Sequence, residues 1–230
     1  MKEDIYLYKL TVDSGGAPCV AKGLLSLAIC KPQIRASAEV GCWLFGFGSN
    51  QVPMLNRLIY IARVTDKLRN GEYYSRDEFR VRPDCIYERT PEKRLSWRRG
   101  AKFHGPDDIP RDVGRFPLYE RANVLLSADF RYLGREGTAE YRNCYPAITA
   151  AVAGLGQGHR VNHVKVLRDE LVKLQRDIWR SYPAKQVLGR PTLEDTSLAC
   201  NSNDPCRTIK RKTGKYLSCL LQGHSPRTES

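Results

Sequence analysis

The sequence lacks several features that mark membrane, secreted and metal-dependent proteins. In its 230 residues, no apolar run approaches the ~18 residues that a membrane-spanning helix needs. The start, MKEDIYLYKL, has neither the apolar core nor the small-residue cleavage site of a signal peptide. We therefore expect no membrane contact, a cytoplasmic location and reduced thiols.

Ligand sets for a structural metal are also missing. The chain has 8 cysteines and 4 histidines, but neither CxxC nor HExxH spacing. Cys200 and Cys206 bracket five residues, and only Cys219 and His224 follow as further ligands, a spacing that does not fit the usual zinc sites. We expect no metal and no cofactor, and we expect most of the cysteines to act as small buried hydrophobes.

What the sequence has in excess is positive charge. Lysine and arginine number 38 against 25 acidic residues, so the formal net charge is +13. Hydrophobic residues make up 41% of the chain, which is ordinary for a globular protein. A charge excess of this size favours polyanions, so we expect contact with nucleic acid or with a nucleotide.

Alternation and β-branched or aromatic content predict strands in five stretches: 4–12, 23–30, 41–49, 57–68 and 122–134. Residues 33–40 predict either one helical turn or an irregular crossing. Residues 82–117 are rich in Pro, Gly, Asp and Arg and predict a long loop, which in a compact domain is usually functional or disordered.

The strongest helix prediction covers residues 162–181. Asn162 is the expected N-cap, and apolar residues step by three and four along one face: Val164, Leu167, Leu171, Leu174 and Ile178. The alanine-rich stretch 145–160 stays ambiguous, because three glycines follow its helical part. The fold class predicted is α+β, with a twisted or barrel-like antiparallel sheet. We expect one domain over 1–189 and a polar, basic, flexible tail over 190–230.

Three stretches carry candidate chemistry, each with a plainer alternative. The basic stretch 89–105 offers Trp97, Arg98 and Arg99 to phosphates and bases; the alternative is a solvated loop. GLGQGHR precedes the long helix and offers His159 and Arg160 to a phosphate; the alternative is a flexible connection. The acid–base candidates are Asp13, His104, Asp107 and His159, although proline-rich turn chemistry also explains residues 104–110.

The series YLYKLTVDSGGAP, LAICKPQIR and AEVGCWLFGFGS resembles the nucleotide modification associated domain 2 family, with DFRYLG and QGHR as weaker matches. The resemblance covers roughly residues 4–185. It implies a domain from phage and bacterial systems that modify DNA bases, with DNA rather than RNA and DNA-modifying enzymes as partners. The family's acidic residue after the strand-opening glycine is Cys42 here, which places a role for that carboxylate in doubt. The same strand also resembles PUA-like barrels of the EVE and YTH types, which implies recognition of a modified base.

Three hypotheses follow for the function, and the first of them concerns the stretch around residues 30–50. In the first, a PUA-like module binds a base, with residues on one strand face and a basic rim in contact with it: Lys31, Arg35, Trp43, Phe47 and Ser49. The glycines between the aromatics would then leave room for a ligand or a backbone. In the second, the chain is itself an enzyme that modifies a nucleotide base. A third hypothesis makes it a scaffold partner that uses the 162–181 helix.

Overall fold

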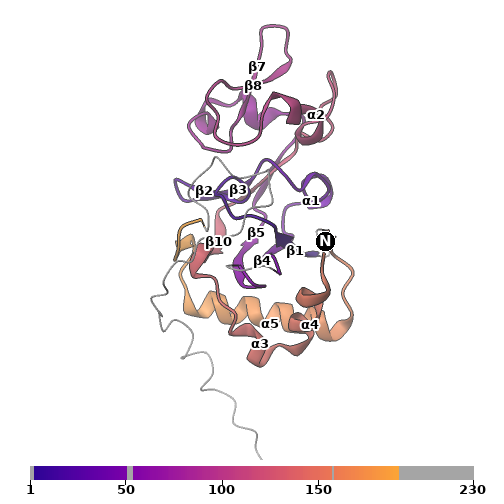
Figure 1. The fold of residues 1–230 in the computed structure, drawn as a ribbon, viewed down its shortest axis with the longest axis vertical. Coiled ribbons are helices and arrows are strands. Elements are labelled where there is room, and N and C mark those ends of the chain that lie inside the picture. Colours follow the sequence, from indigo (N-terminus) through magenta and orange to yellow (C-terminus); the bar gives the residue numbers. More distant parts are fainter. Residues whose placement is uncertain (1–2, 51–53, 157, 192–230) are drawn as a thin grey trace, which may run out of the picture.

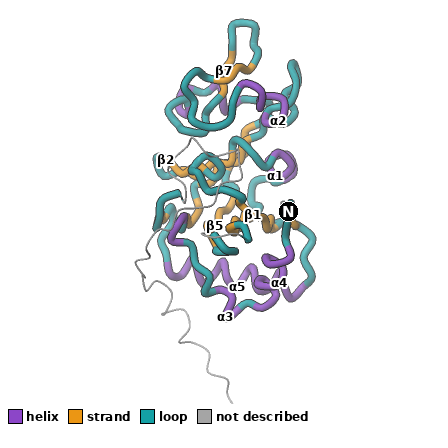
Figure 2. Tube along the Cα trace, in the orientation of Figure 1, coloured by secondary structure: helices purple, strands orange, loops and turns teal. Residues whose placement is uncertain are grey.

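The computed structural model describes residues 3–50, 54–156 and 158–191, and these residues form four layers along the long axis of the molecule (Figure 1). Three helices at one end cover a six-stranded sheet. A four-stranded sheet follows, and a layer made mostly of loops closes the other end (Figure 2). The predicted tail falls almost entirely outside the described residues.

The six-stranded sheet has the strand order β11-β1-β4-β5-β10-β12. Its strands are β1 (Ile5–Leu10), β4 (Trp43–Gly48), β5 (Leu58–Arg63), β10 (Asp129–Tyr132), β11 (His159–Arg160) and β12 (Gln186–Val187). β1 pairs with β4 in parallel, and β10 pairs with β12 in parallel, whereas the other pairs are antiparallel. A parallel pair needs a crossover, and here the segment between β1 and β4 supplies it.

That crossover carries part of the second sheet, whose order is β2-β3-β9-β6. Its strands are β2 (Cys19–Ala21), β3 (Leu24–Leu27), β6 (Asp66–Leu68) and β9 (Val124–Ser127). The loop-rich layer adds the hairpin of β7 (Tyr87–Arg89) and β8 (Leu95–Trp97). The helices are α1 (Pro32–Ser37), α2 (Ile109–Asp112), α3 (Tyr141–Cys144), α4 (Pro146–Gly154) and α5 (Lys165–Ser181), with 3₁₀ turns η1 (Glu72–Ser75), η2 (Asp77–Phe79), η3 (Pro106–Asp108) and η4 (Gly134–Glu136).

Each boundary between layers holds its own apolar core. Tyr6, Tyr8 and Leu10 point from β1 into the core between the two sheets. Ile5 and Leu7, on the opposite face of β1, pack against the helices. A third core lies between the four-stranded sheet and the loop-rich layer. Because β1 is buried on both faces, it reads as an almost continuous apolar run, as strands covered on both sides do.

The prediction of an α+β fold is confirmed, but the barrel-like and PUA-like forms are not. The described strands form separate open sheets, and the larger sheet is mixed rather than antiparallel. The predicted strand over 57–68 divides at Val64-Thr65 into β5 and β6, which join different sheets. The pair predicted over 122–134 divides in the same way into β9 and β10. A pattern of apolar residues identifies a strand, but it carries no information on which sheet the strand enters.

The long helix is confirmed as α5, with a different start. Its N-cap is Val164 rather than Asn162, without a side-chain cap. Four of the five predicted positions are buried, while Val164 itself is 64% exposed. No helix among the described residues has the length and apolar character to cross a membrane.

The strand in the family-like segment AEVGCWLFGFGS lies at the centre of the larger sheet as β4. Phe45 and Phe47 face the helices and Leu44 faces the other sheet, as alternation predicts. The expected ligand space beside the glycines is absent at Gly46, because the Tyr60 ring fills it; a Cβ there would lie 2.2 Å from Tyr60 Cε1.

Candidate active site

The backbone between β3 and α1 contains two consecutive residues with positive φ. Cys30 and Lys31 both adopt left-handed conformations, with φ of 56° and 41°. Residues other than glycine rarely do so, and such strain gathers at functional sites. The turn places the half-buried Cys30 thiol at the end of a buried strand, immediately before the short helix α1.

A histidine and an aspartate from the loop-rich layer complete a chain with this thiol. Cys30 Sγ lies 3.3 Å from Nε2 of His104, and the other ring nitrogen, Nδ1, is hydrogen-bonded to Oδ2 of Asp112. The Tyr87 hydroxyl donates a second hydrogen bond to the same Oδ2, at 2.8 Å. We call Cys30, His104 and Asp112 the Cys–His–Asp triad. A thiol, a base and a residue that orients the base are the groups that a covalent nucleophile requires.

The charges in the triad reinforce one another. Burial alone would lower the pKa of His104, but its hydrogen bonds to Asp112 and Cys30 outweigh burial and raise that pKa to about 10. Burial alone would raise the pKa of Asp112, but the contact with His104 lowers it. At neutral pH His104 is therefore an imidazolium that donates to a carboxylate on one side and to sulfur on the other. Such a cation stabilises negative charge on the sulfur.

One buried arginine fixes the backbone of the site. Arg35 is 0% exposed, and its Nε donates to the carbonyl of Cys30 at 2.7 Å. Its two terminal nitrogens donate to the carbonyls of Asp112, Arg121 and Asn123 at 2.6–2.7 Å. The thiol turn and the end of α2 are thus held by a single guanidinium, although they are 82 residues apart (112 − 30).

Lys31 follows Cys30 in the chain, and it lies near enough to His159 on β11 for their charges to interact. Lys31 Nζ sits 5.3 Å from the centroid of the Tyr8 ring, within cation–π range. Burial lowers the pKa of Lys31. His159 pairs with Tyr8 across β11 and β1, and its ring stacks on Tyr6 at 5.8 Å. Burial and then the Lys31 charge lower the pKa of His159. Lys31 has no carboxylate partner among the described residues, so its charge is open to an anion.

A tyrosine network lies beneath Lys31. The hydroxyl groups of Tyr8 and Tyr60 are hydrogen-bonded to each other. Burial, followed by the effect of Tyr60, raises the pKa of Tyr8 well above its ordinary range. Asp13 is fully buried and accepts hydrogen bonds from the Tyr132 hydroxyl at 2.8 Å. These tyrosine hydroxyl groups stay protonated at neutral pH and form a buried layer of polar groups next to the site.

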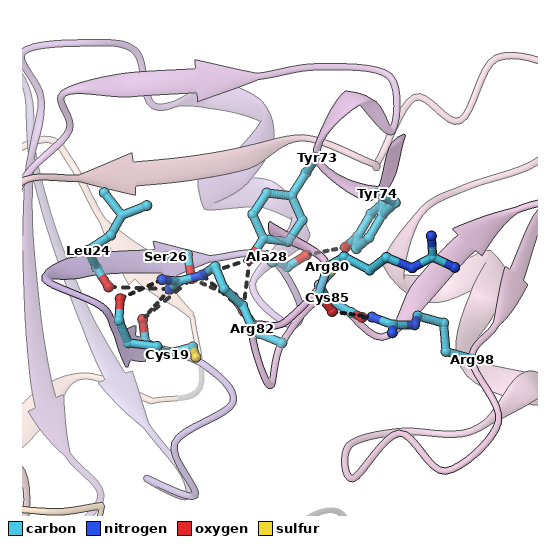
Figure 3. Close-up of polar contacts among 12 residues, drawn as sticks. Cys19, Leu24, Ser26, Ala28, Tyr73, Tyr74, Arg80, Arg82, Cys85 and Arg98 are labelled. Atoms are coloured by element: carbon cyan, nitrogen blue, oxygen red, sulfur yellow. Dashed lines mark hydrogen bonds and ion pairs between the residues drawn. The ribbon is translucent and has the colours of Figure 1, made fainter. Parts of the chain in front are cut away.

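The strand that leads to Cys30 is braced by a second polar network (Figure 3). Tyr74 donates to the carbonyl of Ala28 at 3.0 Å. Arg82 donates to Ser26 Oγ at 2.6 Å and to the carbonyls of Cys19, Ala21 and Leu24. β3 therefore reaches the thiol turn with both its side chains and its backbone held in place.

The geometry of the triad does not suit a metal ion. Among the residues that the structure describes, no three His, Cys, Asp or Glu side chains are placed so that they could hold one. In the triad itself, Cys30 and Asp112 contact opposite nitrogens of the His104 ring. One ion cannot bind both from those positions, because the imidazole ring lies between them.

The structure brings together three of the residues predicted from sequence: Lys31, His104 and His159. Asp13 lies in the network near Tyr8. Asp107 is exposed in η3, apart from the triad contacts.

The other predicted binding residues lie elsewhere. Trp97 donates to the carbonyl of Phe103, and Arg98 donates to the carbonyls of Arg80 and Cys85 (Figure 3). Arg99 and Arg160 are exposed, and Ser49 is half-buried at the end of β4.

Three expectations for residues on α1 and β4 need correction. Arg35 has no exposed surface with which to reach a phosphate, because it serves the backbone carbonyls instead. Phe47 is 0% exposed and packs on Tyr141 in the core beside the helices. Trp43 faces the same side and meets Trp179 edge-on at 5.1 Å. The aromatics of β4 therefore belong to the core layer and not to the site.

Sequence reasoning missed two members of the triad. Cys30 was expected to be a buried hydrophobe, and Asp112 was not singled out. The available signal was a cysteine at the end of a strand, with a histidine and an aspartate inside one long loop. At position 42, where the family has an acidic residue, the Cys42 sulfur accepts a hydrogen bond from the Glu39 N–H at 3.5 Å within a turn.

Comparisons with known proteins place the chain in a family. The family model described as nucleotide modification associated domain 2 matches residues 2–192. No curated protein and no solved structure matches the chain. Since the match covers most of the sequence and spans all three triad residues, the chain belongs to the nucleotide modification associated domain 2 family.

Proposed function

We propose that this protein is a cysteine-dependent enzyme of a nucleotide modification system. The observation that carries the proposal is the Cys–His–Asp triad, with sulfur 3.3 Å from Nε2 of His104 and Asp112 on the opposite nitrogen. Similar constellations of nucleophile, base and orienting residue perform acyl transfer on unrelated folds. Family membership associates the chain with nucleotide modification.

The chemistry follows from the triad geometry. The Cys30 thiolate attacks a carbonyl carbon and forms a C–S bond, and the π electrons move to the oxygen. When the intermediate collapses, the bond to the leaving group breaks, and the leaving atom takes the proton from Nε2 of His104. Water or an amine then attacks the thioester, and His104 takes the proton of the attacking group. The C–S bond breaks and releases the Cys30 thiolate, which restores the starting thiolate and imidazolium. An exocyclic amino group of a nucleobase is the acceptor that suits a nucleotide modification system.

Lys31 supplies the electrostatic part of this proposal. It is desolvated, lies next to the nucleophile in the chain and has no carboxylate partner among the described residues. A cation in such a setting acts more strongly than one in water. In this proposal Lys31 binds the negatively charged part of the substrate, and its cation–π contact with the Tyr8 ring positions its side chain.

The first experiment measures thiol reactivity and needs no known substrate. Iodoacetamide labelling followed by peptide mass spectrometry would compare Cys30 with Cys144, an exposed free cysteine on α3. We expect Cys30 to react roughly tenfold faster at pH 7, although it is less exposed, because the His104 ring lies 3.3 Å from its sulfur and stabilises the negative charge of the attacking sulfur. His104→Gln should remove this advantage and leave Cys144 unchanged. Equal rates in the parent protein would contradict the triad.

The second experiment looks for the product. DNA and nucleotides would be incubated with the protein and cell extract, and their nucleosides would be analysed by mass spectrometry. A new nucleoside that appears with the parent protein and with Cys144→Ser, but not with Cys30→Ala, supports the enzyme.

A binding role without chemistry is the second candidate. It is favoured by the unpaired Lys31 above Tyr8, with the half-buried His159 ring beside it. In this case the protein would recognise a modified base in DNA. Titration of modified and plain oligonucleotides at several salt concentrations tests it. Clean binding by the parent protein, together with no new nucleoside produced by that parent protein, would favour this role over the enzyme.

A further inference from the structure

We propose that a groove beside α2 binds the phosphate backbone of single-stranded nucleic acid. The groove has a volume of ≈ 510 Å³ and is lined by Pro110, Arg111, Arg115, Glu120 and Arg121; we call it the arginine groove. The site does not depend on the chemistry proposed for Cys30. If the arginine groove binds a strand, the protein meets a base within a polymer and not as a free nucleotide.

The arginines of the groove differ in how far they are already paired. Arg111 forms an ion pair with Asp108 at 2.9 Å. Arg115 and Arg121 are exposed, and within the described residues neither side chain has an ion pair or a hydrogen bond. Glu120 lies against Gly114 and lowers the positive potential locally. Two unpaired guanidinium groups in one concave surface are suited to bidentate contacts with phosphates.

Exposed apolar residues lie next to these cations in the sequence. Phe116 is 44% exposed and Leu118 is 73% exposed. The Arg94 guanidinium lies 4.6 Å from the centroid of the Phe116 ring. Aromatic rings among cations are the pattern by which proteins hold single strands, since bases stack while phosphates meet the charges. An acidic protein surface would use the arginines but would have no need for the exposed ring.

The groove is physically joined to the candidate active site. Arg35 donates to the carbonyls of Arg121 and Asp112 and also to that of Cys30, at 2.6–2.7 Å. The backbone on which the groove is built therefore meets the thiol turn at one buried guanidinium. A strand held by its phosphates at Arg115 and Arg121 would lie close to the triad.

Fluorescence anisotropy with a labelled 20-nucleotide single-stranded DNA of mixed sequence tests the inference. All proteins would be full-length and carry glutamine at Lys210, Arg211 and Lys212, so that the basic C-terminal stretch does not dominate the binding. The test variant replaces Arg115 and Arg121 with alanine. The control replaces Lys173 and Arg176, which are exposed on α5, and so makes the same change in net charge.

We expect the groove variant to bind roughly tenfold more weakly at ~0.1 M salt and to lower the slope of log K against log salt by about 1.4, since each contact with a single strand contributes ~0.7. Phe116→Ala should weaken binding without changing the slope. Equal losses in the groove and control variants would overturn the inference, as would displacement of the DNA by polyglutamate at equal charge. Cys30→Ala should bind normally, so a failure of the groove and a failure of the enzyme proposal give different results.

Discussion

Replacement of Asp112 by asparagine would test the charge state of the candidate site most directly. The carboxylate is hydrogen-bonded to Nδ1 of His104 and contributes most to raising the pKa of His104 to about 10. Asparagine keeps the shape of the side chain and removes its charge. Because the pKa of His104 is raised in the folded state, the stabilisation is fully present below pH ~6.5 and is lost as the pH rises towards 10.

The structure sets the size of the effect. A rise from 6.5 to about 10 is 3.5 pH units, which corresponds to about 5 kcal/mol at ~1.36 kcal/mol per unit. This is a ceiling, because Cys30 contributes part of the shift. The side chains of His104 and Asp112 are only 2% and 1% exposed, so water screens little of the interaction. Since loss of one partner from a buried pair costs about 3–5 kcal/mol, we expect Asp112→Asn to lower the free energy of unfolding by about 3 kcal/mol at pH 5.5 and by about 1 kcal/mol at pH 9.5.

Urea denaturation at pH 5.5, 7.5 and 9.5, with reductant present, measures this difference. Tyr87→Phe is the matched control, because it removes the other hydrogen bond to Asp112 Oδ2 and leaves the charges unchanged. The control should lose about 1 kcal/mol at every pH, since burial keeps the pKa of Tyr87 far above this range. If the Asp112→Asn deficit were as large at pH 9.5 as at pH 5.5, His104 would not be a cation in the folded protein and the reasoning would fail.

Three further predictions concern stability and are measured by urea or thermal denaturation. Arg35→Met should cost about 3–5 kcal/mol, because four carbonyls lose their donor, two of them in buried contacts. Gly46→Ala should cost about 1–3 kcal/mol through its clash with the Tyr60 ring, while Gly154→Ala, with open space around it, should be neutral or slightly stabilising. Leu171→Ala, at a fully buried position of α5, should cost about 2–5 kcal/mol.

Local patterns were sufficient for much of the fold. The apolar stripe of α5 and the alternation of β1 and β4 predicted real elements, because a face that must be buried leaves its period in the sequence. The assembly of these elements was not predictable in the same way. β1 and β4 are parallel neighbours although more than thirty residues separate them, and the short segments β5 and β6 join different sheets. Sheet membership depends on distant partners, which no local window contains.

The site was predictable only in part, for a related reason. His104 was found as a polar residue in a long loop, but its partners lie at positions where the residue type suggests another role. A single cysteine after an apolar strand suggests a core residue, and an arginine near a proline suggests the surface. Here the cysteine is held in a strained turn, and Arg35 is completely buried. The role of Cys30 and the role of Arg35 become clear only from their three-dimensional contacts with the loop that carries His104 and Asp112.

Arg35 also connects the two proposals physically. It touches the carbonyls of Cys30, Asp112 and Arg121, so the nucleophile, the residue that orients its base and the arginine groove share one rigid junction. Buried backbone carbonyls rarely go without a donor, and a lysine could not serve four of them because its ammonium has only three donors. The arginine in the family-like segment LAICKPQIR is therefore explained by geometry. Under the two proposals, Arg35 would set the distance between a phosphate bound in the arginine groove and the Cys30 thiol, and so would select which base of a bound strand meets the thiol.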